Sequence, residues 1–278
     1  MLHYFHNHMS VLIAKADGTS ESFKPEKLVS SLERAGADRD IALTIEKDIE
    51  KTLQDGMTTS EIYSRAFEKL RDHRHAVAAR YSLKRAVLEF GPSGFPFESY
   101  LAELYQQEGY ETKVDQIIKG TCVEHEVDVV MRKGDELWYT EAKFHNAAGF
   151  KTDLKTVLYV KARMDDIGKG RGLVATNTKF TEKAIQYATC AGLALLAWDY
   201  PQRGNLHERI EKTALYPVTA LTTLSEREKM ALLSDRVVLC NALPDDASAL
   251  KRAGISGAHA DRVLEEVGAL CVPKNGLL

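Results

Sequence analysis

The first ninety residues combine two short runs of alternating polarity with several amphipathic helical patterns. Residues 10–15 and 21–23 alternate between apolar and polar, and they flank Ala16-Asp17-Gly18-Thr19. Asp-Gly between such runs is a strong signal of a β-hairpin turn. A helix is predicted to begin at Pro25, because proline lacks an N–H that the first helical turn does not need. The apolar stripe of that helix is Leu28, Leu32 and Ala35.

Three more helices are predicted before a clear break in the chain. They cover about residues 41–53, a segment that begins with Thr59 or Ser60 as its N-cap, and residues 75–90. The break is Gly91-Pro92-Ser93-Gly94, a cluster typical of a loop between domains. We therefore expect an N-terminal domain over residues 1–91.

Beyond the break, strand patterns and helix patterns alternate in the order α-β-β-β-α-β-α-β. The predicted elements are residues 97–108, 112–118, 126–131, 137–143, 154–167, 173–175, 181–191 and 193–198. Such an order predicts a mixed sheet between helices. We expect this α/β domain to cover residues 95–200.

The rest of the chain, residues 205–278, is predicted to be a small helical region. Residues 221–243 form a helical stretch that would cover a dimer interface or the sheet. Residues 250–264 resemble a helix-hairpin-helix, whose glycine-rich turn would offer N–H groups to a phosphate. Ser256 stands where that motif has its second glycine, and two short packed helices explain the pattern equally well. We favour the two packed helices.

Composition excludes several classes of protein. Apolar residues make up 44% of the chain and charged residues 28%, which is ordinary for a globular protein. No apolar run approaches the roughly 20 residues of a membrane helix. Residues 1–9 contain no Lys or Arg, so no secretory signal is visible. The cysteines lie far apart with no Cys-x-x-Cys pair, which predicts reduced, mostly buried thiols in a cytoplasmic protein.

The formal net charge of −3 argues against a surface that binds nucleic acid indiscriminately. The charge is nevertheless unevenly distributed along the chain. Between Lys143 and Lys183 there are nine Lys or Arg residues and only four acidic residues. This local excess either faces phosphates or forms an ordinary solvated helix face. Charge alone favours the solvated face.

The N-terminal domain resembles the ATP cone, the small nucleotide-binding regulatory domain of ribonucleotide reductases and of their repressor. The resemblance covers roughly residues 9–90 and depends on 13–18, 23–28, 55–62 and 78–81, which occur in order and at the right spacing. It implies that ATP or dATP binds there. Lys15 and Lys27 would contact the triphosphate, Ile13 and Glu21 the base end, and Thr59 and Tyr63 the pocket wall. Ala16 stands where the family usually has a second basic residue, so a cone that keeps only a docking role is the alternative.

Three residues of the second domain are suited to hydrolysis of phosphodiesters. Asp128 lies thirteen residues before Glu141, and the turn at Gly134 folds the two strands into a hairpin that brings them together. Glu141 and Lys143 are two apart on one strand, so they project to one face. Carboxylates there would hold Mg²⁺ or Mn²⁺, and Lys143 would orient water or stabilise charge. The alternative is an ordinary exposed cross-strand pair.

This set resembles the PD-(D/E)XK nuclease superfamily, and Glu-Ala-Lys is similar to the Mrr-type restriction endonucleases. The framework around it is similar too, notably 97–98, 108–110, 174–184 and 192–198. The resemblance implies a metal-dependent endodeoxyribonuclease with Asp128, Glu141 and Lys143 as catalytic residues. Glu98 matches an acidic residue that some members use as a further metal ligand.

We therefore expect a DNA endonuclease that ATP or dATP regulates, in a homodimer or larger homo-oligomer without a membrane partner. The rival hypothesis is a non-enzymatic, nucleotide-sensing DNA-binding regulator with a decayed nuclease fold. The intact Asp128, Glu141 and Lys143 favour the enzyme.

Overall fold

The structure, a computed structural model, describes residues 11–15, 18–91 and 93–271. Ala16 and Asp17, at the tip of the predicted hairpin, lie outside the described residues, as do residues 1–10. The contacts divide the chain into two compact units, Met1–Ser82 and Leu83–Leu278. This division lies earlier than the predicted boundary at residues 91–94.

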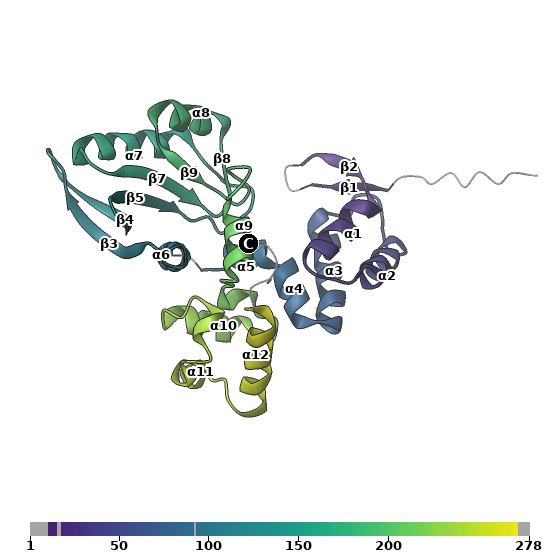
Figure 1. Cartoon of the computed structure of the whole chain (residues 1–278). Coiled ribbons are helices and arrows are strands. Elements are labelled where there is room, and N and C mark those ends of the chain that lie inside the picture. The colour runs from purple at the N-terminus through teal and green to yellow at the C-terminus, as the bar shows by residue number, and fades with distance from the viewer. Residues whose placement is uncertain (1–10, 16–17, 92, 272–278) are drawn as a thin grey trace, which may run out of the picture. The chain divides into compact units, whose positions relative to one another are not determined.

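In its described part, the smaller unit is a β-hairpin followed by helices, as the sequence predicted (Figure 1). Its elements are β1 (Leu12–Ala14), β2 (Ser20–Ser22), α1 (Pro25–Arg34), α2 (Arg39–Glu50), α3 (Thr59–His73) and α4 (His75–Tyr81). The strands are antiparallel, and Ile13 is opposite Glu21. The predicted stripe on α1 packs into a core with apolar residues of α2 and α3. Isolated helices of this length are only marginally stable in water, so their packing into this core supplies most of the stability of the unit.

The N-cap of α3 is Thr58, so the expectation of Thr59 or Ser60 is wrong. The Thr58 hydroxyl accepts from the N–H of Glu61 at 3.1 Å, and the Glu61 carboxylate accepts from the N–H of Thr58 at 2.7 Å. This capping box requires a Glu or Gln three residues after the cap. Thr58 has one, whereas neither Thr59 nor Ser60 does.

The single helix predicted over residues 75–90 is also wrong, because the chain forms two helices there. These are α4 (His75–Tyr81) and α5 (Leu83–Leu88), which belong to different units. Ser82 between them has φ −89° and ψ 3°, and its hydroxyl donates to the carbonyl oxygen of Ala79 at 3.1 Å. Such side-chain bonds to the backbone compete with helix continuation.

The larger unit contains the predicted mixed sheet, with strand order β3-β4-β5-β7-β9. The strands are β3 (Glu111–Lys119), β4 (Glu124–Lys133), β5 (Glu136–Lys143), β7 (Arg171–Thr176) and β9 (Ala194–Leu196). The pairs among β3, β4 and β5 are antiparallel, whereas β5-β7 and β7-β9 are parallel. A short parallel pair, β6 (Lys151–Thr152) with β8 (Lys179–Phe180), was not predicted.

Helices lie on both sides of this sheet (Figure 1). One side carries α7 (Leu154–Ile167) and α8 (Glu182–Ala191), whose apolar residues share a core with Tyr139 and Val174. On the other side, α6 (Phe95–Gln107) packs against β3 and β4. Parallel strands covered on both faces read as continuous apolar runs, which is why β7 and β9 could be predicted.

The turn between β3 and β4 is tied to α7 by one carboxylate. Asp166 accepts from the N–H groups of Cys122 at 2.7 Å and Val123 at 3.3 Å, and it lies 2.7 Å from Nε2 of His125. These bonds hold the pKa of Asp166 well below its usual range, with His125 the largest cause. The β3-β4 hairpin and α7 are therefore fastened together at the turn.

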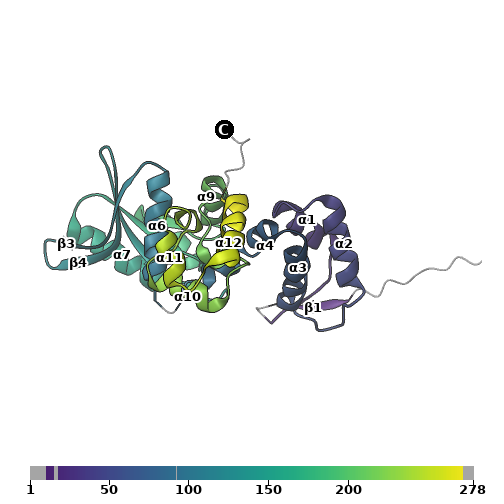
Figure 2. The same ribbon diagram turned by 90° about the horizontal axis from the view of Figure 1, so that it is seen from below.

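The C-terminal region is helical but more broken than expected (Figure 2). Its elements are α9 (Leu206–Thr213), η1 (Val218–Ala220), α10 (Glu226–Ser234), η2 (Cys240–Ala242), α11 (Ala247–Arg252) and α12 (Gly257–Leu270). The predicted helical stretch over 221–243 is an α-helix only over Glu226–Ser234, because Ser225 is the extended N-cap and Arg236 adopts φ 61°, which an α-helix does not contain. Near its end the region is the six-residue α11 and the fourteen-residue α12, with Gly254 at φ +83° in the turn between them.

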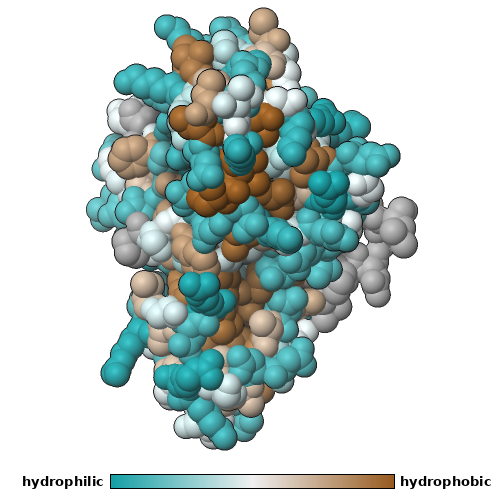
Figure 3. Space-filling view, turned by 90° about the vertical axis from the view of Figure 1, so that its left-hand side faces the viewer, coloured by the Kyte–Doolittle hydropathy of each residue, from teal (hydrophilic) through white to brown (hydrophobic). Residues whose placement is uncertain are grey.

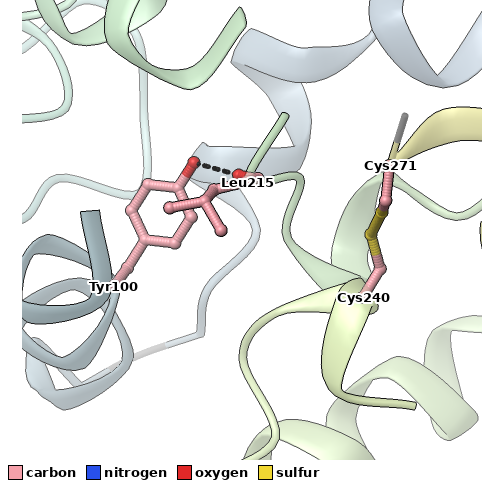
Figure 4. Close-up of a disulfide and its surroundings, with 4 residues drawn as sticks. All are labelled: Tyr100, Leu215, Cys240 and Cys271. Atoms are coloured by element: carbon pink, nitrogen blue, oxygen red, sulfur yellow. Dashed lines mark hydrogen bonds between the residues drawn. A yellow bond between two sulfur atoms is a disulfide. The ribbon is translucent and has the colours of Figure 1, made fainter. Parts of the chain in front are cut away.

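The prediction of four reduced, mostly buried cysteines is wrong. Cys240 and Cys271 form a disulfide that joins η2 to the residue after α12 (Figure 4). Cys122 and Cys190 are free and exposed. The paired cysteines are 31 residues apart, and only the return of α12 brings them together. In the same part of the structure, the Tyr100 hydroxyl of α6 donates to the carbonyl oxygen of Leu215 at 2.7 Å.

The molecular surface is mixed rather than uniformly polar. On the face drawn in Figure 3, apolar patches lie among polar side chains. Large apolar side chains with high exposure in the larger unit include Ile117, Val123, Phe150, Leu158, Tyr159 and Met230. None of the helices in the described part of the chain has the length and apolar character needed to cross a membrane.

Candidate active site

The hairpin of β4 and β5 places Asp128 next to Glu141. Val129 pairs with Thr140, and one further step in this register sets Asp128 opposite Glu141. Instead of a main-chain pair at that step, the Asp128 carboxylate accepts from the N–H of Ala142 at 2.6 Å. The acidic side chain of β4 is thereby fixed against the backbone of β5.

Glu141 lies between two cations. Its Oε1 is 2.5 Å from Nζ of Lys143, and its Oε2 is 2.7 Å from Nη1 of Arg163 on α7. The side chains of Glu141 and Arg163 are each 5% exposed, whereas that of Lys143 is 42% exposed. Oε2 makes no hydrogen bond despite its short distance to Arg163. Glu141 is thus a buried anion with one oxygen incompletely satisfied, and Lys143 is open to solvent beside it.

Three carboxylates interact electrostatically around this point. Burial raises the pKa of Asp128 to about 6, and the charge of Glu141 raises it in the same direction. Glu98, in the first turn of α6, has a pKa of about 7 because of burial and then because of Asp128, with smaller effects of Asp115, Glu126 and Glu141. We call Glu98, Asp128 and Glu141 the carboxylate cluster. Like charges in a partly buried region disfavour ionisation of Asp128 and Glu98.

The carboxylate cluster has the chemistry of a divalent-cation site, although its three carboxylates do not converge on a common position. Within residues 11–15, 18–91 and 93–271, no three His, Cys, Asp or Glu side chains are arranged to hold a metal ion. Hard cations such as Mg²⁺ prefer carboxylate oxygens and are bound by one or two carboxylates with water. The repulsion between Asp128, Glu98 and Glu141, which contributes to the raised pKa values of Asp128 and Glu98, is a feature that a cation would relieve. The residues therefore fit a divalent metal.

Arg163 is the residue of this site to which the sequence assigned no role. It lies on the apolar side of α7, three residues after Val160 and four before Ile167, both of which are buried. A charged residue in a helical stripe of apolar residues requires a buried partner. That pattern was a usable signal for a buried carboxylate near α7.

Past Lys143, the chain is held to the segment after β7 by a side chain. The Asn177 amide accepts from the N–H of His145 at 2.9 Å and donates to its carbonyl oxygen at 2.7 Å. Nε2 of His145 lies 3.2 Å from the hydroxyl of Thr152, and the imidazole stacks on Phe150 with ring centroids 5.8 Å apart. Burial, and then Lys143, lower the pKa of His145. His145 is therefore a half-buried, fixed side chain.

The basic stretch from Lys143 to Lys183 is mostly surface. Arg163 is its one buried member, and Lys143 and Lys161 are half-buried. The exposed members are Lys151, Lys155, Lys169, Arg171, Lys179 and Lys183. The positive excess therefore lies on the surface but not in one place, because Arg171 is opposite Trp138 near the start of β5, whereas Lys143 is opposite Thr176 at its end. Only the basic residues at the Lys143 end are suited to phosphate contacts beside the carboxylate cluster.

In the smaller unit, the hairpin and α1 bring together three of the predicted nucleotide residues. Glu21 lies 2.9 Å from Nζ of Lys15 and 3.3 Å from Nζ of Lys27. The hydrogen bond from Lys15 is the largest cause of a lowered pKa of Glu21. Ile13 is buried opposite Glu21. Two ammonium groups thus converge on one carboxylate.

Thr59 and Tyr63 lie on α3, whose start is next to β1. The N–H of Ala14 donates to the carbonyl oxygen of Met57 at 3.0 Å, which places Thr59 near the hairpin. Tyr63 stacks on Tyr81 at 4.8 Å, and its hydroxyl donates to the Tyr81 carbonyl oxygen at 3.4 Å. Tyr63 is thereby directed toward α4.

Comparison with known proteins assigns three segments of the chain. Family models match an ATP cone domain over residues 11–87, a restriction endonuclease domain of the Mrr type over 92–200, and an AF1548-like C-terminal domain over 216–271. The first two matches confirm the resemblances drawn from the sequence. Nuclease domains of this superfamily generally use divalent metals, and ATP cones bind nucleotides.

Individual relatives match large parts of the chain. An uncharacterized protein of Archaeoglobus fulgidus is 34% identical over 169 residues, which are 60% of this chain and 97% of that protein. The crystal structure of AF1548, a protein of unknown function, has a TM-score of 0.55 and 32% identity and covers 64% of this chain and 98% of its own. The structure of the MspJI restriction endonuclease with a 27-mer oligonucleotide has a TM-score of only 0.31 and 12% identity, over 77% of this chain and 44% of that chain. The chain belongs to the AF1548-like family, and it joins an ATP-cone domain to a nuclease domain of the restriction-endonuclease type.

Proposed function

We propose that this protein is a divalent-metal-dependent endonuclease that hydrolyses phosphodiester bonds of DNA in the cytoplasm, and that ATP or dATP bound to its ATP cone regulates it. The observation that carries the proposal is the position of Asp128, Glu141 and Lys143 on the adjacent strands β4 and β5. A decayed nuclease would be expected to have lost one of these side chains, and all of them are present.

Each residue of the site has a distinct role in the proposal. Asp128 and Glu141, with Glu98 as a further ligand, would hold Mg²⁺ or Mn²⁺. A bound cation of this kind polarises the phosphodiester and lowers the pKa of its water. Lys143, the most exposed of the charged groups beside Glu141, would contact the phosphate and stabilise its developing negative charge. Arg163 would act as a positioning residue, because it holds the Glu141 carboxylate from the side of α7.

The nucleotide half of the proposal depends on Lys15 and Lys27. Both ammonium groups lie at Glu21, and a triphosphate is a stronger partner for two cations than one carboxylate. Ile13 and Glu21 would contact the base end, with Thr59 and Tyr63 in the pocket wall. Because ATP cones of reductases act on subunit association, we expect nucleotide to change the oligomeric state of a homodimer or larger assembly.

A cleavage assay with purified protein tests the enzyme. Supercoiled plasmid is incubated with protein in EDTA, Mg²⁺ or Mn²⁺, with and without ATP, dATP or ADP. We expect nicking or linearisation only with a divalent cation, and loss of cleavage in Asp128→Asn. Glu124→Gln, at an exposed acidic residue on the same strand, is the matched control and should cleave normally.

Two results would contradict the proposal. DNA binding without cleavage in any metal would favour the non-enzymatic regulator. Equal cleavage by the wild type and Asp128→Asn would remove the carboxylate cluster from the chemistry.

A further inference from the structure

We propose that the His145–Phe150 pair is a stacking platform for an unpaired nucleobase of the DNA strand being cut. This inference rests on the proposed nuclease function and adds the form of DNA that the site prefers. We refer to the two side chains as the stacking pair.

The stacking pair follows directly on the candidate catalytic strand. His145 is two residues past Lys143, so on an extended chain it lies about 7 Å farther along the path of β5. A nucleotide whose phosphate contacts Lys143 would have its own base, or that of a neighbour, within reach of His145. The stacking pair therefore lies where a base next to the scissile phosphate would be found.

The imidazole of the stacking pair is held rigidly. Asn177, which is 1% exposed, bonds both the N–H and the carbonyl oxygen of His145, and Thr152 contacts the imidazole. The rings of His145 and Phe150 are inclined by only 11°. A preorganised aromatic surface loses little entropy when a further ring is added to it.

The phenyl ring of the stacking pair is open. Phe150 is 59% exposed, and a cavity of about 260 Å³ is lined by Phe144, His145, Asn146 and Phe150. Phe144 is fixed by ring contacts with Phe90 and Phe97, whose centroids lie at 6.2 Å and 6.0 Å. An exposed aromatic ring next to a polar cavity is suited to a flat ligand that stacks on it.

The surroundings of the stacking pair specify the ligand. Lys143 and the exposed Lys151 supply positive charge on either side of it in the chain, which matches a phosphate backbone. Proteins that bind single strands combine a basic groove with aromatic rings on which bases stack. A base within a duplex has both faces covered by its neighbours, whereas an unpaired base offers a free face. The combination therefore favours an unpaired base over intact duplex.

Binding measurements in EDTA test the platform separately from cleavage. Three DNA substrates of one sequence are compared: a single strand, a perfect duplex, and a duplex with one bulged base. We expect the wild type to bind the single strand and the bulged duplex more tightly than the perfect duplex. Phe150→Ala should weaken binding of the first two by about 5- to 150-fold, and Phe150→Tyr should restore it. The affinity for the perfect duplex should change little in either variant.

Leu158→Ala is the matched control, because Leu158 is an exposed apolar residue of α7 outside the stacking pair. A Phe150→Trp variant adds a direct signal, since a stacked base quenches indole fluorescence. Quenching by single-stranded DNA without any cleavage in metal would support the platform while refuting the nuclease. Cleavage of perfect duplex with no effect of Phe150→Ala on any substrate would refute the platform while leaving the nuclease. Preference for the bulged duplex over the single strand would identify a base turned out of a duplex as the ligand.

Discussion

The carboxylate of Glu141 and the guanidinium of Arg163 lie 2.7 Å apart, and each side chain is 5% exposed. The pair joins the strand of the candidate active site to the helix that covers it. Neither side chain is open to bulk water, and Arg163 is the buried one of the two cations that contact Glu141.

We therefore expect Arg163→Met to lower the free energy of unfolding by about 3–5 kcal/mol, because it leaves a buried carboxylate without its buried partner. Glu141→Ala should also be destabilising, because it leaves the buried guanidinium of Arg163 without its carboxylate partner. Glu141→Gln is therefore the better test of catalysis. Urea unfolding measures both. The double variant Arg163→Met/Glu141→Leu should recover most of the loss, and failure to recover would show that the cost comes from packing and not from an unpaired charge.

Lys143 should matter for the rate and little for the fold. Its side chain is 42% exposed, so Lys143→Met should leave the unfolding curve nearly unchanged while cleavage falls by about 100-fold or more. Lys212→Met, at an exposed lysine of α9 outside the basic stretch, is the control. The cleavage rate is measured under single-turnover conditions at saturating metal, and urea unfolding measures the stability of each variant. An active Lys143→Met protein would exclude Lys143 from the reaction.

Asp128 and Glu98 should contribute less to the stability of the metal-free protein as pH rises. The pKa values of Asp128 and Glu98 are raised to about 6 and about 7 from ordinary values of 3.8 and 4.5. Through these two groups the folded state binds more protons than the unfolded state between about pH 4 and pH 7, so their contribution to the free energy of unfolding falls across that window. Urea unfolding in EDTA, compared between the wild type and Glu98→Gln, should show that the variant lacks the fall due to Glu98. Glu103→Gln, at an exposed residue of the same helix, should keep it.

Nucleotide should stabilise the protein if its ATP cone is competent. A ligand at about a hundredfold excess over its Kd adds about 2.7 kcal/mol to the free energy of unfolding. Calorimetric titration and melting with ATP, dATP and ADP measure the effect, and light scattering measures association. Lys27→Ala should abolish most of the shift, whereas Lys47→Ala on α2 should not. An unchanged wild-type melting temperature with no heat would leave the cone as a docking module, with Ala16 as the reason.

The disulfide should be detectable and stabilising. Non-reduced protein should carry two free thiols, those of Cys122 and Cys190. Removal of the Cys240–Cys271 link by Cys271→Ser should lower the free energy of unfolding by about 2–4 kcal/mol, since the link closes a loop in the unfolded chain. Thiol titration under denaturing conditions and urea unfolding test the two statements. Four reactive thiols in untreated protein would contradict the link.

Much of the architecture was predictable because the apolar residues of its strands and helices recur at regular spacings in the sequence. The turn at Gly134 and the alternation around Asp128 predicted the β4-β5 hairpin, and the apolar stripe of α7 predicted its bounds as Leu154–Ile167. The break at Ser82 was not predictable, because the apolar pattern continues through it and one hydroxyl contact decides the geometry. The pair of β6 and β8 has only two residues in each strand, too few to show alternation.

Part of the candidate site could likewise be predicted from the sequence, and part could not. Asp128, Glu141 and Lys143 could be chosen from spacing, since residues two apart on a strand share a face. The bonds of Asn177 to His145 connect segments that follow different strands through a side chain, and no sequence period encodes such a contact. The Cys240–Cys271 link likewise depends on where α12 returns.

The hold of Asp166 on the β3-β4 turn has a consequence for regulation. Helix α7 is fastened to the β3-β4 turn through Asp166 and to β5 through the contact of Arg163 with Glu141. Two attachment points between one helix and the same sheet oppose sliding of the helix along the sheet. A nucleotide signal that reached this domain would then meet a rigid reaction centre, so its simplest target is the entry of DNA and not the spacing of the groups that cut it.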